Sequence, residues 1–222
     1  MILLFGAEKG GVGKSTLATN VAAEFARQGA DVLLADTDTQ PTGSEWAAIR
    51  AENEKLAGLT VIQKHGAINH DITKLKDKYD HIIIDAGGGD TREMRSAMLV
   101  ADLWYIPMTA TYADAWTLKK VYENLYEQII TIRPELQAMV VTSMGSTHPK
   151  VDDRGTIEGL LQERGYLSES FALSQAVLYR REAYRTAIGM GAAVSELEKG
   201  LRDEKAVSEL ATLFSEITSY AR

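Results

Sequence analysis

Short apolar runs alternate with helix-forming stretches from one end of the chain to the other. The apolar runs cover residues 2–5, 32–35, 61–62, 82–84, 103–106 and 139–141. Most of them are continuous rather than alternating, which is typical of strands that helices cover on both faces. The helix-forming stretches cover residues 16–28, 44–55, 91–101, 113–132, 154–164 and 204–220. This order predicts an α/β fold with a mostly parallel, twisted sheet and helices on both faces.

Composition narrows the class of protein. At 222 residues, the chain is expected to form a single domain over residues 1–222. It contains no cysteine, which excludes disulfides, Fe–S clusters and cysteine-based zinc sites. No signal peptide is recognised and no apolar run reaches the roughly 18 residues of a membrane span, so a cytoplasmic location is expected. The net charge of −7 argues against a protein that coats nucleic acid with its whole surface, but it allows a local basic patch.

A glycine-rich turn between the first apolar run and the first helical stretch carries the strongest chemical signal. The turn and the start of the helix read Lys9, Gly10, Gly11, Val12, Gly13, Lys14, Ser15 and Thr16. Glycines let backbone N–H groups converge on phosphate oxygens, and a helix N-terminus adds partial positive charge. Lys14 would reach the β- and γ-phosphates, and the Ser15 hydroxyl would ligate Mg²⁺. The pattern predicts a phosphate- and Mg²⁺-binding loop.

The position of Lys9 narrows the class further. The plain phosphate-loop pattern has glycine where this chain has Glu8, and here Lys9 precedes a pair of glycines instead. This arrangement resembles the deviant Walker A motif, K-G-G-x-G-K-[ST], of the ParA/MinD group of ATPases. The resemblance implies a homodimer that encloses two ATP molecules, in which Lys9 of each copy reaches the phosphates of the other. Lys9 would then stabilise the transferred phosphate as an arginine finger does elsewhere.

Acidic side chains follow two of the apolar runs. Asp36 and Asp38 lie two positions apart at the end of a strand, so their side chains point the same way. They resemble the family motif D-x-D-P-Q, in which Asp38 matches the residue linked to water activation and Asp36 its supporting, Mg²⁺-side partner, although Thr39 stands where the family has proline. Asp85 resembles the Walker B acid that holds the Mg²⁺ shell. Capping of the next helix is the alternative role for the first two acids.

Three consecutive glycines at 87–89 follow the Walker B acid. Ordering them costs backbone entropy, which predicts a mobile segment beside the γ-phosphate. In the family that it resembles, this position is a switch that changes with nucleotide state. A merely flexible loop is the alternative.

A basic stretch near the C-terminus is the candidate for DNA contact. Arg181 and Arg185 lie four residues apart and share a helix face, with Arg180 beside them. The stretch resembles the C-terminal part of partition ATPases, which implies non-specific DNA binding. An ordinary solvated face is the alternative.

Two helical stretches are expected to pack against the sheet. Trp116, Tyr122 and Tyr126 lie on the long helical stretch and are expected to be packing residues rather than a binding site. The last helix places Glu209 and Glu216 on its polar face, where a membrane-binding helix would carry lysine and arginine. We therefore expect no membrane association.

Taken over nearly its whole length, the chain resembles a ParA-type partition ATPase of the short kind, without an N-terminal DNA-binding extension. The resemblance implies ATP-driven dimerisation, non-specific binding to nucleoid DNA, and hydrolysis stimulated by a centromere-binding, ParB-type adaptor that carries a plasmid. Positioning of a non-DNA cargo, such as a protein microcompartment, is one alternative. A MinD-like membrane switch is another, and a small-molecule ligase of dethiobiotin-synthetase type, which has no need of Lys9 acting across a dimer, is a third.

Overall fold

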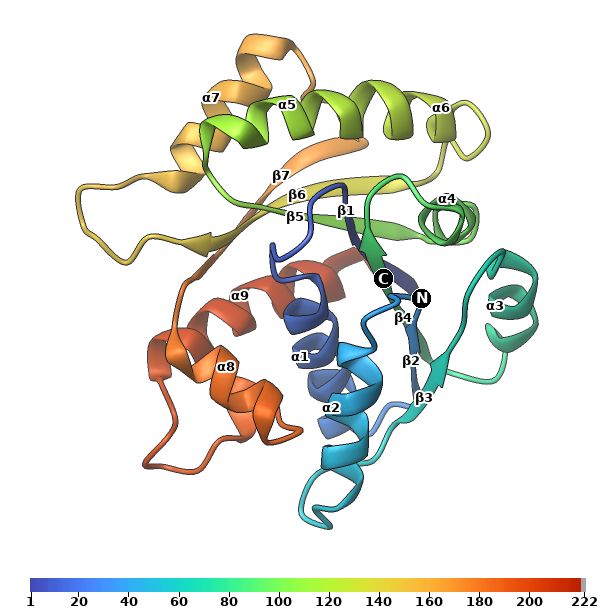
Figure 1. Cartoon of the computed structure of the whole chain (residues 1–222), viewed down its shortest axis with the longest axis vertical. Helices are drawn as coiled ribbons and strands as arrows, with labels where there is room; N and C mark the ends of the chain where they lie inside the picture. Colours follow the sequence, from blue (N-terminus) through green and yellow to red (C-terminus); the bar gives the residue numbers. More distant parts are fainter. Residues whose placement is uncertain (221–222) are drawn as a thin grey trace.

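The computed structural model describes residues 1–220, apart from the side chains of residues 112–115. In this part of the chain, seven strands form one sheet in which every neighbouring pair is parallel, in the order β3-β2-β4-β1-β5-β6-β7. The strands are β1 (Ile2–Ala7), β2 (Val32–Asp36), β3 (Thr60–Gln63), β4 (His81–Gly88), β5 (Leu103–Met108), β6 (Gln137–Gly145) and β7 (Phe171–Tyr179). The predicted parallel α/β fold is confirmed, and the first strand lies at the centre of the sheet (Figure 1).

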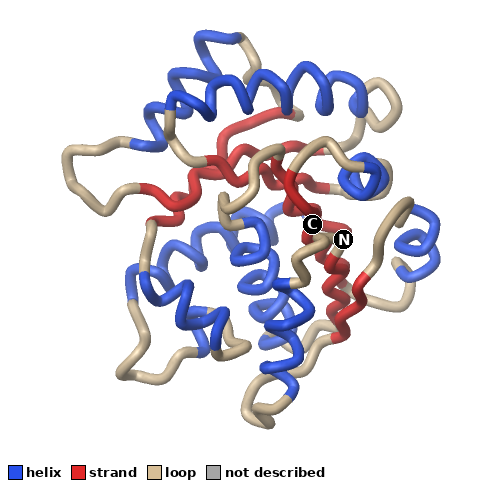
Figure 2. Tube along the Cα trace, viewed as in Figure 1, coloured by secondary structure: helices blue, strands red, loops and turns tan. Residues whose placement is uncertain are grey.

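Helices cover both faces of the sheet (Figures 1 and 2). One face is covered by α1 (Lys14–Arg27), α2 (Thr42–Ala51), α8 (Glu182–Gly189) and α9 (Glu204–Tyr220). The other is covered by α3 (Asn69–Leu75), α4 (Arg92–Met98), α5 (Tyr112–Lys120), α6 (Glu127–Ile130) and α7 (Asp153–Arg164). A π-helical segment, Val121–Tyr126, joins α5 to α6, and a short 3₁₀ turn, Val194–Glu196, precedes α9. Each face has its own apolar core, because the strands are buried on both sides.

Strand β7 is the strand that the sequence pattern does not predict, and α3 is a helix that it does not predict. Strand β7 lies at the edge of the sheet, and its burial varies along its length because only part of it is covered. Two acids of α9 reach its backbone: Gln175 N donates to Glu216 Oε2 at 2.8 Å, and Tyr179 N donates to Glu209 Oε2 at 3.2 Å. The prediction that this helix packs on the sheet is confirmed, and its two glutamates face the edge strand rather than bulk solvent. They satisfy backbone donors of an edge strand, and such a strand must otherwise be protected from unwanted pairing.

The aromatic residues of the α5–α6 helix differ in their burial. Tyr126 is buried and Tyr122 is half-buried, so both pack as predicted. Trp116 is 72 % exposed, so the prediction that it packs in the core is wrong. The inward-facing positions of this helix are instead occupied by Leu118 and Val121. Within residues 1–220, none of the helices has the length and apolar character needed to cross a membrane.

Candidate functional site

The glycine-rich loop of residues 8–13 joins β1 to α1 at the carboxyl end of the central strand. Gly11 and Gly13 have φ angles of 72° and 93°, in the left-handed region that favours glycine. A Cβ atom on Gly13 would also lie 2.8 Å from the Ser143 hydroxyl, so β6 leaves no room for a side chain there. Residues 14–16 form the first turn of α1, where unpaired backbone N–H groups attract anions. The loop has the form that phosphate binding requires.

Lys14 points into this loop rather than to solvent. Only 5 % of the residue is exposed, and its Nζ donates to the Lys9 carbonyl at 3.3 Å. Burial lowers the pKa of the Lys14 ammonium, while Asp85 and Asp38 raise it. The cation is therefore held between the loop backbone and two carboxylates, at the place where phosphate charge is to be received.

Asp85 lies at the carboxyl side of β4 and is completely buried. Among the described residues, neither of its carboxylate oxygens has a hydrogen-bond partner. Burial raises the pKa of Asp85 to about 7; Asp36 adds to this, and the nearby Ser15 hydroxyl and Lys14 ammonium counteract it. A buried carboxylate without a partner is costly. Its oxygens match what Mg²⁺ binds, and Ser15 supplies a hydroxyl beside it.

Asp36, the neighbour of Asp85 in sheet register, is also completely buried but is fully engaged. Its Oδ2 accepts hydrogen bonds from Ser44 N at 2.8 Å and Ser44 Oγ at 3.1 Å, and its Oδ1 accepts one from Asp38 N at 3.2 Å. Burial raises the pKa of Asp36, whereas these hydrogen bonds lower it. The carboxylate therefore holds the start of α2 and the loop that carries Asp38. These contacts agree with the alternative role given to Asp36 above, in which it caps the helix that follows.

Asp38 lies at the rim of the same loop, less buried than the other two acids. Its Oδ1 accepts a hydrogen bond from Gln40 N at 3.0 Å. An ideal Cβ on Gly87 would lie 3.4 Å from the Asp38 carboxyl carbon, so β4 packs directly against it. The structure thus brings Asp38 and Lys14 to one small cavity, and both Asp38 and Asp85 lie close enough to Lys14 to raise its pKa.

The first two glycines of the run after Asp85 belong to a strand, and only Gly89 lies beyond it. Strand β4 continues through Gly88, which pairs with Ala7 of β1. An ideal Cβ on Gly88 would lie 3.1 Å from the backbone nitrogen of Gly10. Gly88 therefore permits close approach of β4 to the phosphate loop, and a larger side chain at this position would meet the loop backbone.

Two adjoining cavities lie above the carboxyl ends of the central strands. A cavity of about 250 Å³ is lined by the phosphate loop together with Asp38. A second cavity of about 400 Å³ is mainly apolar and is lined by residues of β6, β7 and α8. Gly13, Thr16, Thr42 and Met144 border both cavities. Met144 has a φ of 53°, an uncommon conformation for a residue with a side chain. The polar cavity suits the phosphates of a nucleotide, and the adjoining apolar cavity suits its base.

The three predicted DNA-contact arginines have different environments. Arg180 is exposed, and Arg185 is 81 % exposed with an ion pair to Glu182 at 3.2 Å. Arg181 is only 15 % exposed, and it pairs with Glu209 at 2.6 Å and with Asp203 at 3.6 Å. All three border the larger cavity. The structure therefore leaves two of the three arginines directed to solvent.

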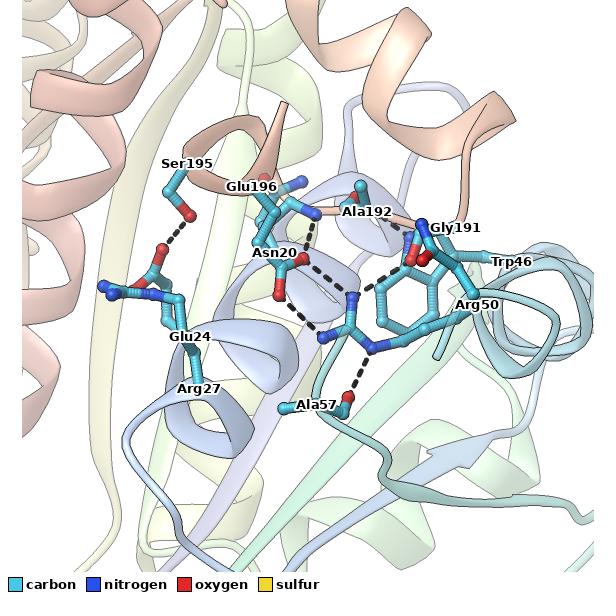
Figure 3. A network of polar contacts seen from close by, with 12 residues as sticks. Asn20, Glu24, Arg27, Trp46, Arg50, Ala57, Gly191, Ala192, Ser195 and Glu196 are labelled. Atoms are coloured by element: carbon cyan, nitrogen blue, oxygen red, sulfur yellow. Dashed lines mark hydrogen bonds and ion pairs between the residues drawn. The ribbon is translucent and has the colours of Figure 1, made fainter. Parts of the chain in front are cut away.

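A buried polar network that the sequence does not reveal joins α1 and α2 to the segment between α8 and α9 (Figure 3). Arg50 of α2 forms a bidentate ion pair with Glu196 at 2.7 Å, and the two side chains are 3 % and 6 % exposed. Arg50 also donates to the carbonyls of Gly191 and Ala57. Asn20 of α1 accepts a hydrogen bond from the backbone of the same segment. The segment between α8 and α9 is thereby fastened to the helices that follow the phosphate loop and Asp36.

The comparison with known families agrees with this geometry. Residues 3–214 match the profile of the CobQ/CobB/MinD/ParA nucleotide binding domain. The chain belongs to this family. Protein ParA from Rhizobium radiobacter is 24 % identical over 218 residues, which cover 96 % of this chain and 94 % of that protein. The "Maintenance of carboxysome distribution protein A" from Halothiobacillus neapolitanus is 23 % identical over 210 residues, which cover 94 % of this chain and 92 % of that protein.

Solved structures show the same fold. Apo McdA from Cyanothece superposes with a TM-score of 0.72 at 18 % identity, covering 100 % of this chain and 99 % of that one. An ATP complex of a variant of that protein superposes with a TM-score of 0.70 at 17 % identity, covering 99 % and 95 %. The likeness extends over the whole sheet and its helices, so β7 and α8, which border the larger cavity, belong to the shared fold.

The acids of the site fit Mg²⁺ shared with phosphate better than a metal held by protein alone. Within the described residues, no group of three or more histidines or acids converges on one point. Mg²⁺ commonly uses one or two protein oxygens and completes its shell with water and substrate phosphates. Asp85, with its unpartnered oxygens, and Ser15, at the start of α1, provide that smaller number.

Proposed function

We propose that this protein is a Mg²⁺-dependent ATP hydrolase that dimerises in its ATP state and positions DNA, with a plasmid as its cargo. The observation that carries the proposal is the unpartnered, buried Asp85 carboxylate beside Lys14 and Ser15 at the end of the phosphate loop. A resting structural site would not leave a buried carboxylate without a hydrogen bond. A site that binds a cation together with a charged substrate requires such an unpartnered carboxylate.

Each side chain of the proposed site has a separate task. The backbone N–H groups of residues 10–16 bind the phosphates, and Lys14 neutralises charge on the β- and γ-phosphates. Ser15 and Asp85 would hold Mg²⁺, which supplies charge neutralisation during transfer, and Asp36 supports them by fixing the neighbouring loop. Asp38 orients the attacking water. Lys9, from the second copy, stabilises the charge that develops on the transferred phosphate.

Family membership and the exposed arginines support the proposed partners. We propose non-specific DNA contact through the exposed Arg180 and Arg185, and ParB-type adaptor stimulation of hydrolysis, in the cytoplasm and on the nucleoid. Arg181 contributes indirectly in this proposal, because its ion pairs with Glu209 and Asp203 hold the start of α8 in place. The position of the arginines at the border of the nucleotide cavity supports a link between nucleotide state and DNA contact.

A second candidate function differs only in the cargo. One relative is named for carboxysome distribution, and the two McdA structures superpose over nearly the whole chain. We infer that the same ATPase cycle also suits a protein compartment as cargo. Only the adaptor distinguishes the two functions, because the ATP-binding residues would be the same in both.

The decisive experiment measures mass by light scattering with ADP and with a non-hydrolysable ATP analogue, with and without random-sequence duplex DNA. We expect a monomer with ADP, and with the analogue a dimer that binds DNA. Lys14→Ala is the control and should not bind nucleotide. Asp38→Ala should bind ATP, fail to cleave it, and form the dimer with ATP itself. If the protein stays monomeric with every nucleotide and does not bind DNA, the proposal is overturned and the small-molecule ligase is favoured.

A further inference from the structure

Glu209 of α9 is the centre of a polar cluster at the larger cavity. One of its carboxylate oxygens accepts a hydrogen bond from the Arg181 guanidinium at 2.6 Å. The other accepts hydrogen bonds from Tyr179 N at 3.2 Å and from the Tyr184 hydroxyl at 3.4 Å. These three partners all border the larger cavity, whereas Glu209 is not one of the described residues that line it. Glu209 therefore acts on the cavity through its partners.

The ion pair with Glu209 fixes the edge of the Arg181 guanidinium. Nε and Nη2 of Arg181 both lie 2.6 Å from the same Glu209 oxygen, and Nη1 lies 3.6 Å from Asp203 Oδ2. The guanidinium carbon lies 5.5 Å from the centre of the Tyr179 ring, within the range of a cation–π contact. The nitrogen donors of Arg181 are thereby directed to two acids, which leaves the flat face of the group to border the cavity.

Tyr184 is held in a similar way. Its hydroxyl donates to Ala206 O at 3.2 Å and lies 3.4 Å from Glu209 Oε2, so the polar end of the side chain is bound to α9. Burial raises the pKa of Tyr184, and the Glu209 charge adds to this, so the phenol stays protonated and acts as a donor. The aromatic ring is the part of the side chain that remains to line the cavity.

A guanidinium face and an aromatic ring are surfaces on which heterocyclic bases stack. The rest of the larger cavity is mainly apolar, with Leu17, Leu178 and Ile188 in its lining. The cavity meets the phosphate cavity at Gly13 and Thr16. A nucleotide whose phosphates lie in the loop therefore reaches these stacking surfaces with its base.

We propose that Glu209 is a positioning residue for the base of the bound nucleotide. It orients the flat faces of Arg181 and Tyr184 as a stacking surface and does not touch the nucleotide itself. The inference rests on the proposed function, since it takes the phosphate loop to bind the phosphates of ATP and ADP. It gives α9, which lies outside the nucleotide-binding loops, a role in nucleotide affinity.

Removal of the Glu209 charge should release Arg181 from this position. The Arg181 side chain is only 15 % exposed, and a cation that is so little exposed requires a charged partner. Asp203, at 3.6 Å, is the more distant of its two acids. Without Glu209, the guanidinium should turn toward Asp203 and solvent, and the stacking surface of the cavity is lost.

Glu216 provides a matched control on the same helix. It lies seven positions after Glu209 and makes contacts of the same kind, accepting a hydrogen bond from Gln175 N at 2.8 Å and one from the Tyr105 hydroxyl at 2.7 Å. Within the described part of the chain, neither Gln175 nor Tyr105 borders the larger cavity. Glu216→Gln therefore reports the structural effect of losing such a carboxylate, without an effect on the cavity.

Calorimetric titration with Mg²⁺-ADP and with Mg²⁺-pyrophosphate tests the proposal. Pyrophosphate has the phosphates without the base, and ADP avoids a contribution from the proposed ATP-state dimer. Glu209→Gln keeps the size of the side chain and an acceptor for Tyr179 N but removes the charge that holds Arg181. We expect it to bind ADP roughly tenfold more weakly, as for loss of one stacking contact, and pyrophosphate within about twofold of the unchanged protein. Glu216→Gln should bind both ligands within about twofold.

A double-mutant cycle tests whether Glu209 acts through Arg181. Arg181→Met should also weaken ADP binding and leave pyrophosphate binding unchanged. Glu209→Gln combined with Arg181→Met should cost much less than the two separate effects together, because the second change then has no guanidinium left to orient. If Glu209→Gln does not fold, as judged by thermal unfolding, Glu209→Asp takes its place, since it shortens the reach to Arg181 and keeps the charge.

The outcomes separate this inference from the proposed function. Normal ADP affinity in the Glu209 variant overturns the inference, and so does an equal loss of ADP and pyrophosphate affinity, which indicates a general effect on the fold. An equal loss of ADP affinity in Glu216→Gln, or fully additive effects in the cycle, also overturns it. All of these results leave the proposed ATPase intact. If the unchanged protein binds neither ADP nor pyrophosphate, the proposed function itself is overturned.

Discussion

Asp36 and Asp85 are register partners on β2 and β4, yet among the described residues only Asp36 receives hydrogen bonds from the protein. Both carboxylates are completely buried and belong to the same end of the sheet. The difference in hydrogen bonding distinguishes a structural acid from one that is available to a ligand. Both oxygens of Asp36 accept hydrogen bonds from the loop and helix that follow it, whereas the oxygens of Asp85 accept none in the described part of the chain and can coordinate a ligand.

Replacing Asp85 should therefore affect chemistry and stability in opposite directions. Asp85→Asn replaces a buried carboxylate that has no hydrogen-bond partner among the described residues with a neutral amide, so we expect equal or higher thermal stability of the nucleotide-free protein at pH 8. Mg²⁺-dependent ATP hydrolysis should fall by roughly 100-fold or more, because a cation ligand beside the phosphates is lost. Thermal unfolding and a Mg²⁺ titration of the hydrolysis rate measure the two effects. Normal hydrolysis in this variant would contradict the assignment.

Replacing Asp36 should instead destabilise the fold. Asp36→Ala removes three hydrogen bonds to an ionised acceptor and leaves the N-terminal turn of α2 without its partner. We expect a loss of about 2–3 kcal/mol in the free energy of unfolding, measured with urea. Ser44→Ala, which removes only the hydroxyl contact, is the matched control and should lose about 1 kcal/mol. Equal stability of the two variants would show that the backbone contacts of Asp36 contribute little.

Replacing Gly88 tests whether the glycine run serves close packing against the phosphate loop or flexibility of the backbone. A methyl group at Gly88 would lie 3.1 Å from Gly10 N, so Gly88→Ala must displace the phosphate loop by a few tenths of an ångström. We expect roughly tenfold weaker binding of a fluorescent ATP analogue, since small misplacements near a phosphate site have large effects. Gly200→Ala is the control, because nothing lies within 4 Å of a Cβ at that position. If Gly88→Ala binds as well as the control, the glycines serve flexibility instead.

The predicted site residues that the structure brings together are those that directly follow a strand. The phosphate loop, Asp38 and Asp85 each follow directly from a strand, and parallel strands bring their carboxyl ends to one edge of the sheet. Strand order and loop composition were therefore enough to place them together. For the same reason, the parallel α/β fold was predictable from the alternation of apolar and helical stretches.

The features that the sequence missed depend on contacts between distant parts of the chain. Arg50 and Glu196 are 146 positions apart, and nothing in the local pattern of either residue marks it as buried. Glu209 looked like a surface acid, because periodicity does not show that an edge strand would present a backbone donor to it. Trp116 looked like a core residue, because its exposure depends on which face of α5 meets the sheet.

His81 should make stability depend on pH. Its ring stacks on Phe25 with centroids 3.8 Å apart, and its Nδ1 is buried without a hydrogen-bond partner among the described residues. Burial lowers the pKa of His81, as does the nearby N-terminal ammonium, while Asp80 raises it. The unfolded chain then binds more protons than the folded one below a pH of about 6.5, so stability is complete above that pH and falls as the pH decreases.

His81→Phe keeps the aromatic stack and removes the titration. We expect its melting temperature to fall less than that of the unchanged protein between pH 7.5 and pH 5.5, as measured by calorimetry. His70→Phe is the control, because His70 is exposed. It should show the same pH dependence as the unchanged protein. If the melting temperature falls equally with pH in all three proteins, groups other than His81 dominate acid unfolding.

The buried network of Figure 3 makes a prediction about how the site is held together. Arg50→Met leaves Glu196 as a buried charge without its main partner, and we expect a loss of about 3–5 kcal/mol in the free energy of unfolding. The double variant Arg50→Met, Glu196→Met should recover a large part of that loss, since two apolar side chains can replace a buried ion pair. A double-mutant cycle with urea unfolding measures the coupling.

The same variants test whether the network also serves the nucleotide site. The Arg50 side chain fastens α2 to the segment between α8 and α9, and Ser44, in the first turn of α2, donates to Asp36. If these parts move as one body, the double variant should fold stably and bind nucleotide normally but lose part of the nucleotide dependence of DNA binding. The two methionines of the double variant would pack against each other without the fixed geometry of a bidentate ion pair. A double variant that keeps the full nucleotide dependence would limit the network to a role in stability.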